Sequence, residues 1–257
     1  MNDTTAAGFA HRLREGHPTV GYWVVCDNPV GTERIARTGY DYVCIDAQHG
    51  LIDSRAVLAA ITAIDSYDVP ALVRVQANDP FWIGQSLDAG ARGVIVPMVD
   101  TVADAQAAVA ACRYPPTGRR SFGPMRAQLR VGPTPAEADA EVACLVMIET
   151  RDGLRNVKEI AAVPGVDGLY VGPSDLRLAL GGKTPNDPAV DAAFDEALSA
   201  VRAAAAAAGI VAGIHCLDGA TAANRLAQGF TYVSVASDLV HLEQAARDHL
   251  TAARGGE

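Results

Sequence analysis

The stretch GVIVPMVDTVADAQAAVAACR, residues 93–113, contains the pattern that decides the fold. It opens with a short apolar run, residues 93–98, which is typical of a buried strand. The segment that follows, residues 101–113, has the periodicity of an amphipathic helix. A buried strand followed at once by a helix indicates a parallel sheet that is covered by helices.

The same unit recurs along the chain. Apolar runs of strand length occur at 21–27, 40–47, 71–75, 93–98, 143–149, 168–172, 210–215 and 232–237. Helical segments lie between them, and most end at a glycine. Eight units predict an α/β fold, a single-domain (β/α)8 TIM barrel over residues 1–257. Residues 1–17 would form an N-terminal helical or flexible segment. Residues 238–257 would form a C-terminal helix that packs on a neighbouring subunit. The longest insertions, 99–142 and 173–209, are expected on the C-terminal face, where barrel enzymes place their chemistry.

Charge and composition exclude several classes of protein. A net charge of −9 argues against a nucleic-acid partner, which requires a concentrated basic surface. Apolar runs stop well short of the ~20 residues that span a bilayer, and the N-terminus lacks a secretory signal. We therefore expect a cytoplasmic protein without membrane contact. Five widely spaced cysteines indicate reduced, mostly buried side chains rather than disulfides or a thiolate zinc site.

One basic segment departs from the acidic average. Residues 113–130 contain Arg113, Arg119, Arg120, Arg126 and Arg130. Two interpretations stay open: a contact with an anionic ligand or another subunit, or a loop whose arginines pair with acidic neighbours.

Polar residues stand at or just beyond the predicted strand ends. They are Asp46 and His49, Arg74, Glu149 and Asp175. In a barrel these positions converge on one pocket. Each residue taken alone could instead be a helix N-cap or part of an ion pair at the rim.

Glu149 and Asp175 are the predicted metal ligands. Two carboxylates provide the hard oxygens that Mg²⁺ or Mn²⁺ prefers, whereas zinc would recruit more histidine or cysteine. Co²⁺ and Zn²⁺ stay possible. The alternative is that the two carboxylates only cap the helices that follow them.

Three further features suit the chemistry of such a pocket. Imidazole suits proton transfer near neutral pH, so His49 is the candidate acid–base residue, with Asp88 as a possible orienting partner. Arg74 lies in an apolar strand and needs an anion such as an enolate or carboxylate. The backbone of Gly172, Pro173 and Ser174 could bind a carboxylate. His215 is expected to be structural or pocket-lining.

Lysine is scarce in this chain. Lys158 lies in a helical segment and Lys183 in a loop, and neither falls at a strand end. A barrel aldolase that forms a Schiff base needs a buried lysine there, so a covalent imine is not expected. An enolate would then need a metal for its stabilisation.

Seven ordered motifs together resemble the HpcH/HpaI aldolase family. They are DAQHG (46–50), RVQANDP (74–80), LDAGARGVIVPMVDT (87–101), RYPPTGRRSFG (113–123), MIETRDGL (147–154), GVDGLYVGPSDL (165–176) and GFTYVSVASD (229–238). The resemblance covers the chain from about residue 18 onward. It implies a class II, divalent-metal-dependent aldolase that cleaves 4-hydroxy-2-oxo acids to pyruvate and an aldehyde. It also implies a homohexamer, a trimer of dimers, with active sites near subunit interfaces.

The resemblance assigns roles to single residues. It implies that Glu149 and Asp175 bind the metal, that Arg74 stabilises the enolate, and that His49, oriented by Asp88, moves the proton. Asp46 would then lie near a metal-bound water.

Two positions depart from the family pattern. Gln48 stands where many relatives have glutamate, and Met147 where some have glutamine, which leaves the substrate open. Trp23, Phe122 and Ile214 are candidates for the aldehyde pocket. The alternative activity is a carbon–carbon lyase of the citrate lyase β-subunit or malyl-CoA lyase type, which acts on a CoA thioester.

Overall fold

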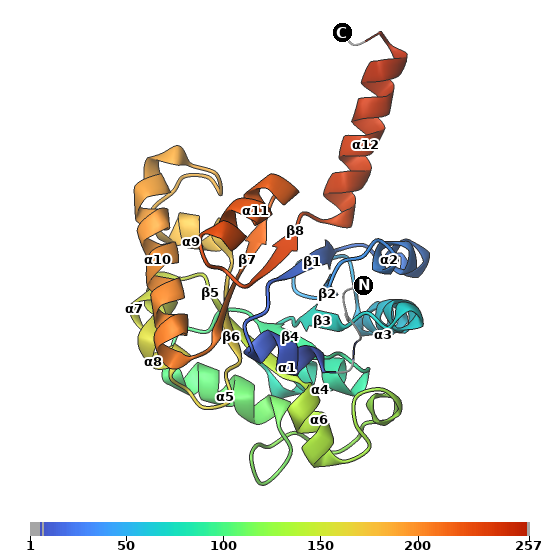
Figure 1. Ribbon diagram of the computed structural model, residues 1–257, viewed down its shortest axis with the longest axis vertical. Helices are drawn as coiled ribbons and strands as arrows, with labels where there is room; N and C mark the ends of the chain where they lie inside the picture. Colours follow the sequence, from blue (N-terminus) through green and yellow to red (C-terminus); the bar gives the residue numbers. More distant parts are fainter. Residues whose placement is uncertain (1–5, 7, 256–257) are drawn as a thin grey trace.

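Eight parallel strands form a closed barrel surrounded by helices (Figure 1). The computed structural model describes residue 6 and residues 8–255. Neighbours in sequence pair in space, and the last strand pairs with the first. The predicted single-domain (β/α)8 barrel is confirmed, with all eight strands at the predicted places. The strands are β1 (Thr19–Val24), β2 (Tyr42–Asp46), β3 (Ala71–Arg74), β4 (Gly93–Val96), β5 (Ala143–Ile148), β6 (Gly168–Val171), β7 (Val211–Cys216) and β8 (Tyr232–Val235).

Helices follow each strand and cover the outside of the barrel. Short 3-10 turns, η1 (Asp65–Tyr67), η2 (Ala127–Leu129) and η3 (Pro188–Val190), interrupt the connections. The helices are α1 (Phe9–Arg14), α2 (Pro29–Ala36), α3 (Ser54–Ile64), α4 (Pro80–Asp88), α5 (Val102–Cys112), α6 (Pro135–Glu141), α7 (Arg151–Arg155), α8 (Val157–Ala161), α9 (Pro173–Ala179), α10 (Asp191–Ala208), α11 (Gly219–Ala227) and α12 (Asp238–Ala253).

Alternation along each strand divides the buried residues into two layers. Side chains at successive strand positions point to opposite faces, so every second residue faces the barrel interior. The outward set, which includes Ile45, Val73 and Ile214, packs against the helices. The inward set fills the interior with Trp23, Tyr42, Cys44, Leu72, Ile95, Leu145, Met147, Tyr170 and Tyr232. The interior is therefore a packed core whose upper layer forms the floor of any pocket at the barrel mouth.

Helix α1 closes the amino-terminal end of the barrel. Phe9 and Leu13 belong to the interior cluster and are buried. Arg14 donates from Nε to Asp167 (2.7 Å) and from Nη2 to the carbonyl of Val142 (2.9 Å). Part of the predicted N-terminal segment is thus helical, whereas residues 1–5 and 7 lie outside the described residues.

The predicted position of the insertion at 99–142 is wrong in part. Helix α5 begins directly after β4, and the extra residues follow that helix instead. They pack at the amino-terminal end, where Glu141 contacts Arg92 (3.3 Å) and accepts from the backbone of Gly8 (2.9 Å). Helix α6 lies beside α1 in Figure 1. The insertion therefore lies opposite the face expected to carry chemistry.

The basic segment in this insertion pairs with acidic neighbours. Arg113 donates to Asp167 (3.0 Å), Arg120 to Asp88 (2.7 Å) and Arg126 to Asp65 (2.5 Å). The second interpretation of the arginines is supported, with the difference that Arg113 and Arg120 are buried rather than solvated. All five cysteines are free, and all but Cys26 are buried, as expected.

Helix α12 extends away from the barrel (Figure 1). Its first residue, Asp238, accepts from the backbone amides of Val25 and Cys26, which anchors the helix to the end of β1. No residue of α12 is buried. The predicted C-terminal helix is confirmed as a helix, and its contact with a neighbouring subunit stays a prediction. None of the described helices combines the length and apolar character that crossing a bilayer needs.

Candidate active site

Inward-facing polar residues gather at the carboxyl-terminal ends of the strands. Asp46 is the last residue of β2, Arg74 is the last residue of β3, and His215 is the second-last residue of β7. Asp46 and Arg74 follow the interior residues Cys44 and Leu72 by two positions, and His215 follows the interior residue Val211 by four, which gives all three the same inward direction. They border a cavity of about 250 Å³. The cavity is lined by Trp23, Val25, Asp46, His49, Arg74, Met147, Tyr170, Gly172, Pro173, Ser174, Asp175, His215 and Ser237.

Asp46 and Arg74 form a bidentate ion pair. Arg74 donates from Nε to Oδ1 (2.9 Å) and from Nη2 to Oδ2 (2.5 Å). Burial acts to raise the pKa of Asp46, but the hydrogen bonds and charge of Arg74 outweigh it, and the pKa lies below its usual value. Asp46 uses one edge of the guanidinium, so Nη1 of Arg74 stays available to a ligand in the cavity.

Asp46 also holds the loop that carries His49. Its Oδ1 accepts from the backbone amides of Gln48 and His49 (both 3.1 Å), and its Oδ2 accepts from Nε1 of Trp23 (3.1 Å). His49 lines the cavity, and no described side chain hydrogen-bonds its imidazole. Gln48, which was predicted to contact the substrate, does not line the cavity: its amide donates to Asp46, and its side-chain oxygen is buried without a hydrogen-bond partner among the described residues.

Glu149 is held in place by two backbone features. Its Oε1 accepts from the amide of Met98 (2.9 Å), a residue with a left-handed backbone, φ 56°. Its Oε2 lies against Gly172, where an added Cβ would approach it to 2.4 Å. The alternative of a helix cap is wrong for Glu149, because Thr150 caps α7 by accepting from Gly153. Only a glycine at position 172, directly after β6, leaves room for the Glu149 carboxylate in this position.

Glu149 and Asp175 face each other closely enough to interact. Burial raises the pKa of Glu149, and the negative charge of Asp175 raises it further, against the amide of Met98 and the charge of Arg74. Asp175 lines the cavity and Glu149 is buried and absent from the lining. Two neighbouring like charges are stabilised when a cation binds both. Within the described residues, no group of three or more histidine, cysteine or acidic side chains converges as a metal site, here or elsewhere, so Glu149 and Asp175 form a pair without a third such ligand. The chemistry of this carboxylate pair fits a divalent cation.

The turn after β6 borders the cavity as predicted. Gly172 is the N-cap of α9, and no side chain caps this helix end. Pro173 and Ser174 follow in its first turn and line the cavity with Asp175. Asp175 therefore stands in the first helical turn without serving as the N-cap.

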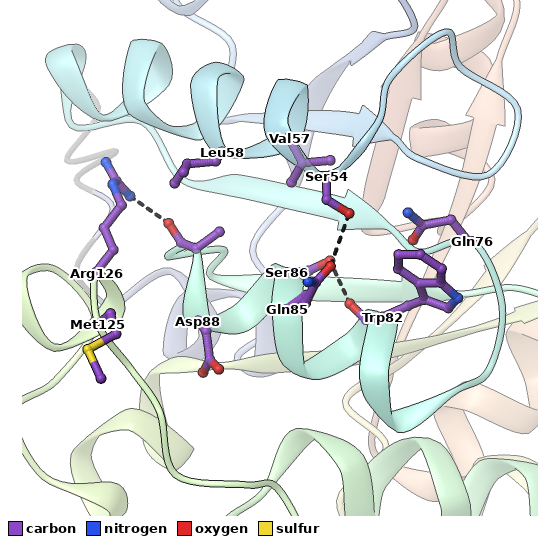
Figure 2. A pocket seen from close by; sticks show the side chains of 11 residues that line it. Ser54, Val57, Leu58, Gln76, Trp82, Gln85, Ser86, Asp88, Met125 and Arg126 are labelled. Atoms are coloured by element: carbon purple, nitrogen blue, oxygen red, sulfur yellow. Dashed lines mark hydrogen bonds between the residues drawn. The ribbon is translucent and has the colours of Figure 1, made fainter.

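Asp88 does not meet His49 within one chain. It is the last residue of α4, which runs back from the mouth of the barrel to the amino-terminal end, and it binds Arg120 there. Burial raises the pKa of Asp88, and Arg120 compensates only in part. Figure 2 shows Asp88 beside a hollow of about 280 Å³ between α3 and α4, outside the barrel. Asp88 and His49 thus lie at opposite ends of the barrel.

Two expectations about the aldehyde pocket are wrong. Ile214 faces the outer helices and belongs to the outer cluster, because its inward neighbour in β7 is His215. Phe122 lies in the amino-terminal insertion, where its ring contacts Tyr114 at 5.5 Å. Met147 lines the cavity, and so does His215, which was predicted to be structural or pocket-lining. The alternation along β5 and β7 is the sequence signal for both inward positions.

A protein-family model, HpcH/HpaI aldolase/citrate lyase, matches residues 19–245. The chain belongs to this family. It is 44% identical over 244 residues to a hydroxypyruvate/pyruvate aldolase of Rhizorhabdus wittichii, which covers 93% of this chain and 96% of that protein. The crystal structure of an HpcH/HpaI aldolase/citrate lyase family protein from Burkholderia cenocepacia matches with a TM-score of 0.88 and 35% identity, covering 96% of this chain and 99% of that one. This HpcH/HpaI family member is accordingly an enzyme, a carbon–carbon lyase.

The citrate lyase branch of the family is more distant. The citrate lyase β subunit of M. tuberculosis, solved with oxaloacetate and magnesium, matches with a TM-score of 0.58 and 20% identity, over 87% of this chain and 93% of that one. At this identity the likeness shows the fold alone. The alternative of a CoA-thioester lyase therefore gains no support beyond the shared barrel.

Proposed function

We propose that this protein is a divalent-metal-dependent class II aldolase that cleaves 4-hydroxy-2-oxo acids to pyruvate, or a close analogue, and an aldehyde. The observation that carries the proposal is the cavity itself. It brings the guanidinium of Arg74, the unpaired imidazole of His49 and the carboxylate of Asp175 into one space at the carboxyl ends of the strands, and the charge of Asp175 acts on the buried Glu149. The relative from R. wittichii is named as a hydroxypyruvate/pyruvate aldolase, which supports pyruvate or a close analogue as the 2-oxo acid of the reaction.

The side chains divide the reaction between them. His49 accepts the proton of the substrate 4-hydroxyl, and the C3–C4 bond breaks as that oxygen becomes the aldehyde carbonyl. The bonding electrons pass into an enolate over C2, C3 and the 2-oxo oxygen. Nη1 of Arg74 donates to this developing charge, and Asp46 fixes the guanidinium in place. C3 then takes up a proton, and pyruvate leaves.

Glu149 and Asp175 would hold the cation. A divalent ion, Mg²⁺ or Mn²⁺ by the preference of carboxylate oxygens, supplies Lewis-acid polarisation of the 2-oxo group when bound. Gly172 keeps the Glu149 carboxylate in position by leaving space for Oε2. The turn at Gly172, Pro173 and Ser174 lines the cavity, and its backbone would bind the substrate carboxylate.

Asp88 can orient His49 only across a subunit interface, because the two lie at opposite ends of one barrel. The catalytic role assigned to Asp88 is therefore part of the proposed hexamer. Its own partner in this chain, Arg120, would position it at the amino-terminal surface.

The test is a retro-aldol assay coupled to pyruvate detection, with 4-hydroxy-2-oxo acids as substrates. We expect protein treated with EDTA to lose activity by more than about 10²-fold, and Mg²⁺ or Mn²⁺ to restore it. Glu149→Gln should abolish the restoration. His49→Gln should cost about 10²–10⁴-fold, the range of positioned proton transfer.

Two outcomes would contradict the proposal. Full activity after EDTA treatment would exclude an essential cation. A borohydride-trapped substrate adduct on Lys158 or Lys183 would demonstrate an imine mechanism instead. A matched control is Asp152→Asn, an exposed carboxylate that pairs only with Arg155, and its activity should stay within about twofold of wild type.

A further inference from the structure

His215 occupies one wall of the active-site cavity with an unused hydrogen-bonding atom. It lies in β7 with its side chain directed inward, and its ring meets Trp23 edge-on, with centroids 5.0 Å apart and planes at 68°. Its Nδ1 is buried and has no hydrogen-bond partner among the described residues. Buried polar atoms are almost always paired, and because His215 lines the cavity, a ligand bound there can supply the partner.

The imidazole is neutral under ordinary conditions. Burial and the positive charge of Arg74 lower the pKa of His215 to about 4, against a smaller opposite effect of Asp46. A neutral imidazole presents one donor and one acceptor nitrogen, which suits a hydroxyl group, since a hydroxyl can both donate and accept. A carboxylate suits it less well, because only one of its nitrogens carries a proton.

The rest of the cavity leaves one part of the substrate without a polar partner. In the proposed function, Arg74, the carboxylate pair and the turn after β6 bind the pyruvate half. Trp23, which lies against His215, and Val25 and Met147 give the lining its apolar surface. Ser237 also lines the cavity, but its hydroxyl already accepts from the amide of Val240, whereas His215 keeps an unpaired nitrogen for the aldehyde half of a substrate.

We propose that His215 hydrogen-bonds a hydroxyl group on the aldehyde half of the substrate, so that the enzyme selects hydroxylated aldehydes over their deoxy counterparts. This assignment rests on the proposed aldolase function and names the class of its second substrate. A site built to pair a substrate hydroxyl discriminates strongly against the analogue that lacks it, because the buried partner is then left unpaired.

The test compares glycolaldehyde with acetaldehyde as acceptors of pyruvate, using the metal-reconstituted protein. His215→Phe keeps an aromatic edge against Trp23 and removes both nitrogens, whereas His215→Asn keeps a donor and an acceptor. The measured quantity is the ratio of kcat/KM for the two aldehydes. We expect His215→Phe to lower this ratio by at least about tenfold and His215→Asn to keep most of it.

A second measurement separates this proposal from the proposed function. Exchange of the C3 hydrogens of pyruvate in deuterated water needs only the pyruvate half of the site, so it should change little in both variants. An unchanged aldehyde ratio in His215→Phe, or a loss of exchange as large as the loss of aldol addition, would overturn the role of His215. Absence of both reactions in the wild type would remove the aldolase function and this assignment with it.

Discussion

Asp46 combines two tasks that the sequence does not distinguish. It neutralises Arg74 inside the barrel mouth, and it accepts from two amides of the loop that presents His49. A single carboxylate therefore fixes both the electrostatic group and the proton-transfer group of the proposed reaction. This arrangement separates the role of Asp46 from that of Glu149, whose Oε1 accepts from the amide of Met98 and whose Oε2 lies against Gly172.

Asp46→Asn should destabilise the protein in a pH-dependent way. The variant leaves the guanidinium of Arg74 buried with a neutral partner, which costs about 3 kcal/mol at pH 7. The folded-state pKa of Asp46 is lowered, so its stabilisation is present above the unfolded-state pKa of ~4 and is lost as the pH falls through the folded-state value. Urea unfolding of both proteins at neutral pH and at pH ~3 measures the difference between their free energies of unfolding. This difference should be smaller in acid. A gap that widens in acid would contradict the ion pair.

At the scale of single elements, the alternation of side chains near the strand ends determines which residues of the site can be predicted from the sequence. Alternation along β2, β3, β5 and β7 is sufficient to place the inward positions. In β7 it assigns the inward position to His215 and the outward position to Ile214. The structure supplies what alternation cannot, namely the side-chain contacts across strands.

Two features could not be obtained from local sequence patterns. The pattern of residues 113–134 indicates a long connection but not the end of the barrel at which it folds, because that depends on where α5 ends. The position of Asp88 relative to His49 is the second feature. Its position at the end of a helix that runs away from the mouth puts it beside Arg120, a contact 32 residues away in sequence.

The junction of β6 and α9 gives a prediction about one element. Gly172→Ala adds a Cβ that would approach Oε2 of Glu149 to 2.4 Å and Cε of Met147 to 2.9 Å. The carboxylate must move, and misplacement of about 1 Å at an active site costs about 10²-fold in rate. We expect that loss in the pyruvate-release assay, with a far smaller change in melting temperature.

The matched control is Gly84→Ala in helix α4, where an added Cβ meets nothing within 4 Å. This substitution should leave the rate within about twofold of wild type and stabilise the helix by up to about 1 kcal/mol. Equal losses of rate in the two variants would show that the effect at residue 172 is not specific to the space beside Glu149.

Across the whole molecule, the two ends of the barrel carry different kinds of charge pair. The carboxyl-terminal end holds Arg74 with an open Nη1, while the amino-terminal end holds Asp167 among several donors. Asp167 accepts from Arg14 (2.7 Å), from Arg113 (3.0 Å) and from the amide of Cys144 (2.7 Å). In barrel enzymes the first end serves catalysis and the second stability.

Asp167→Asn should therefore lower stability while sparing the proposed chemistry. The substitution leaves Arg113 buried without its counter-charge, which costs about 3 kcal/mol and lowers the melting temperature by about 6–12 °C in a chain of this size. Below that temperature kcat should stay within about twofold of wild type, because the carboxylate lies at the end of the barrel opposite the cavity. Thermal unfolding and the pyruvate-release assay on one preparation give both quantities. A fall in kcat without a fall in melting temperature would show that the amino-terminal end takes part in the reaction. It would contradict the assignment of catalysis to the carboxyl-terminal end and of stability to the amino-terminal end.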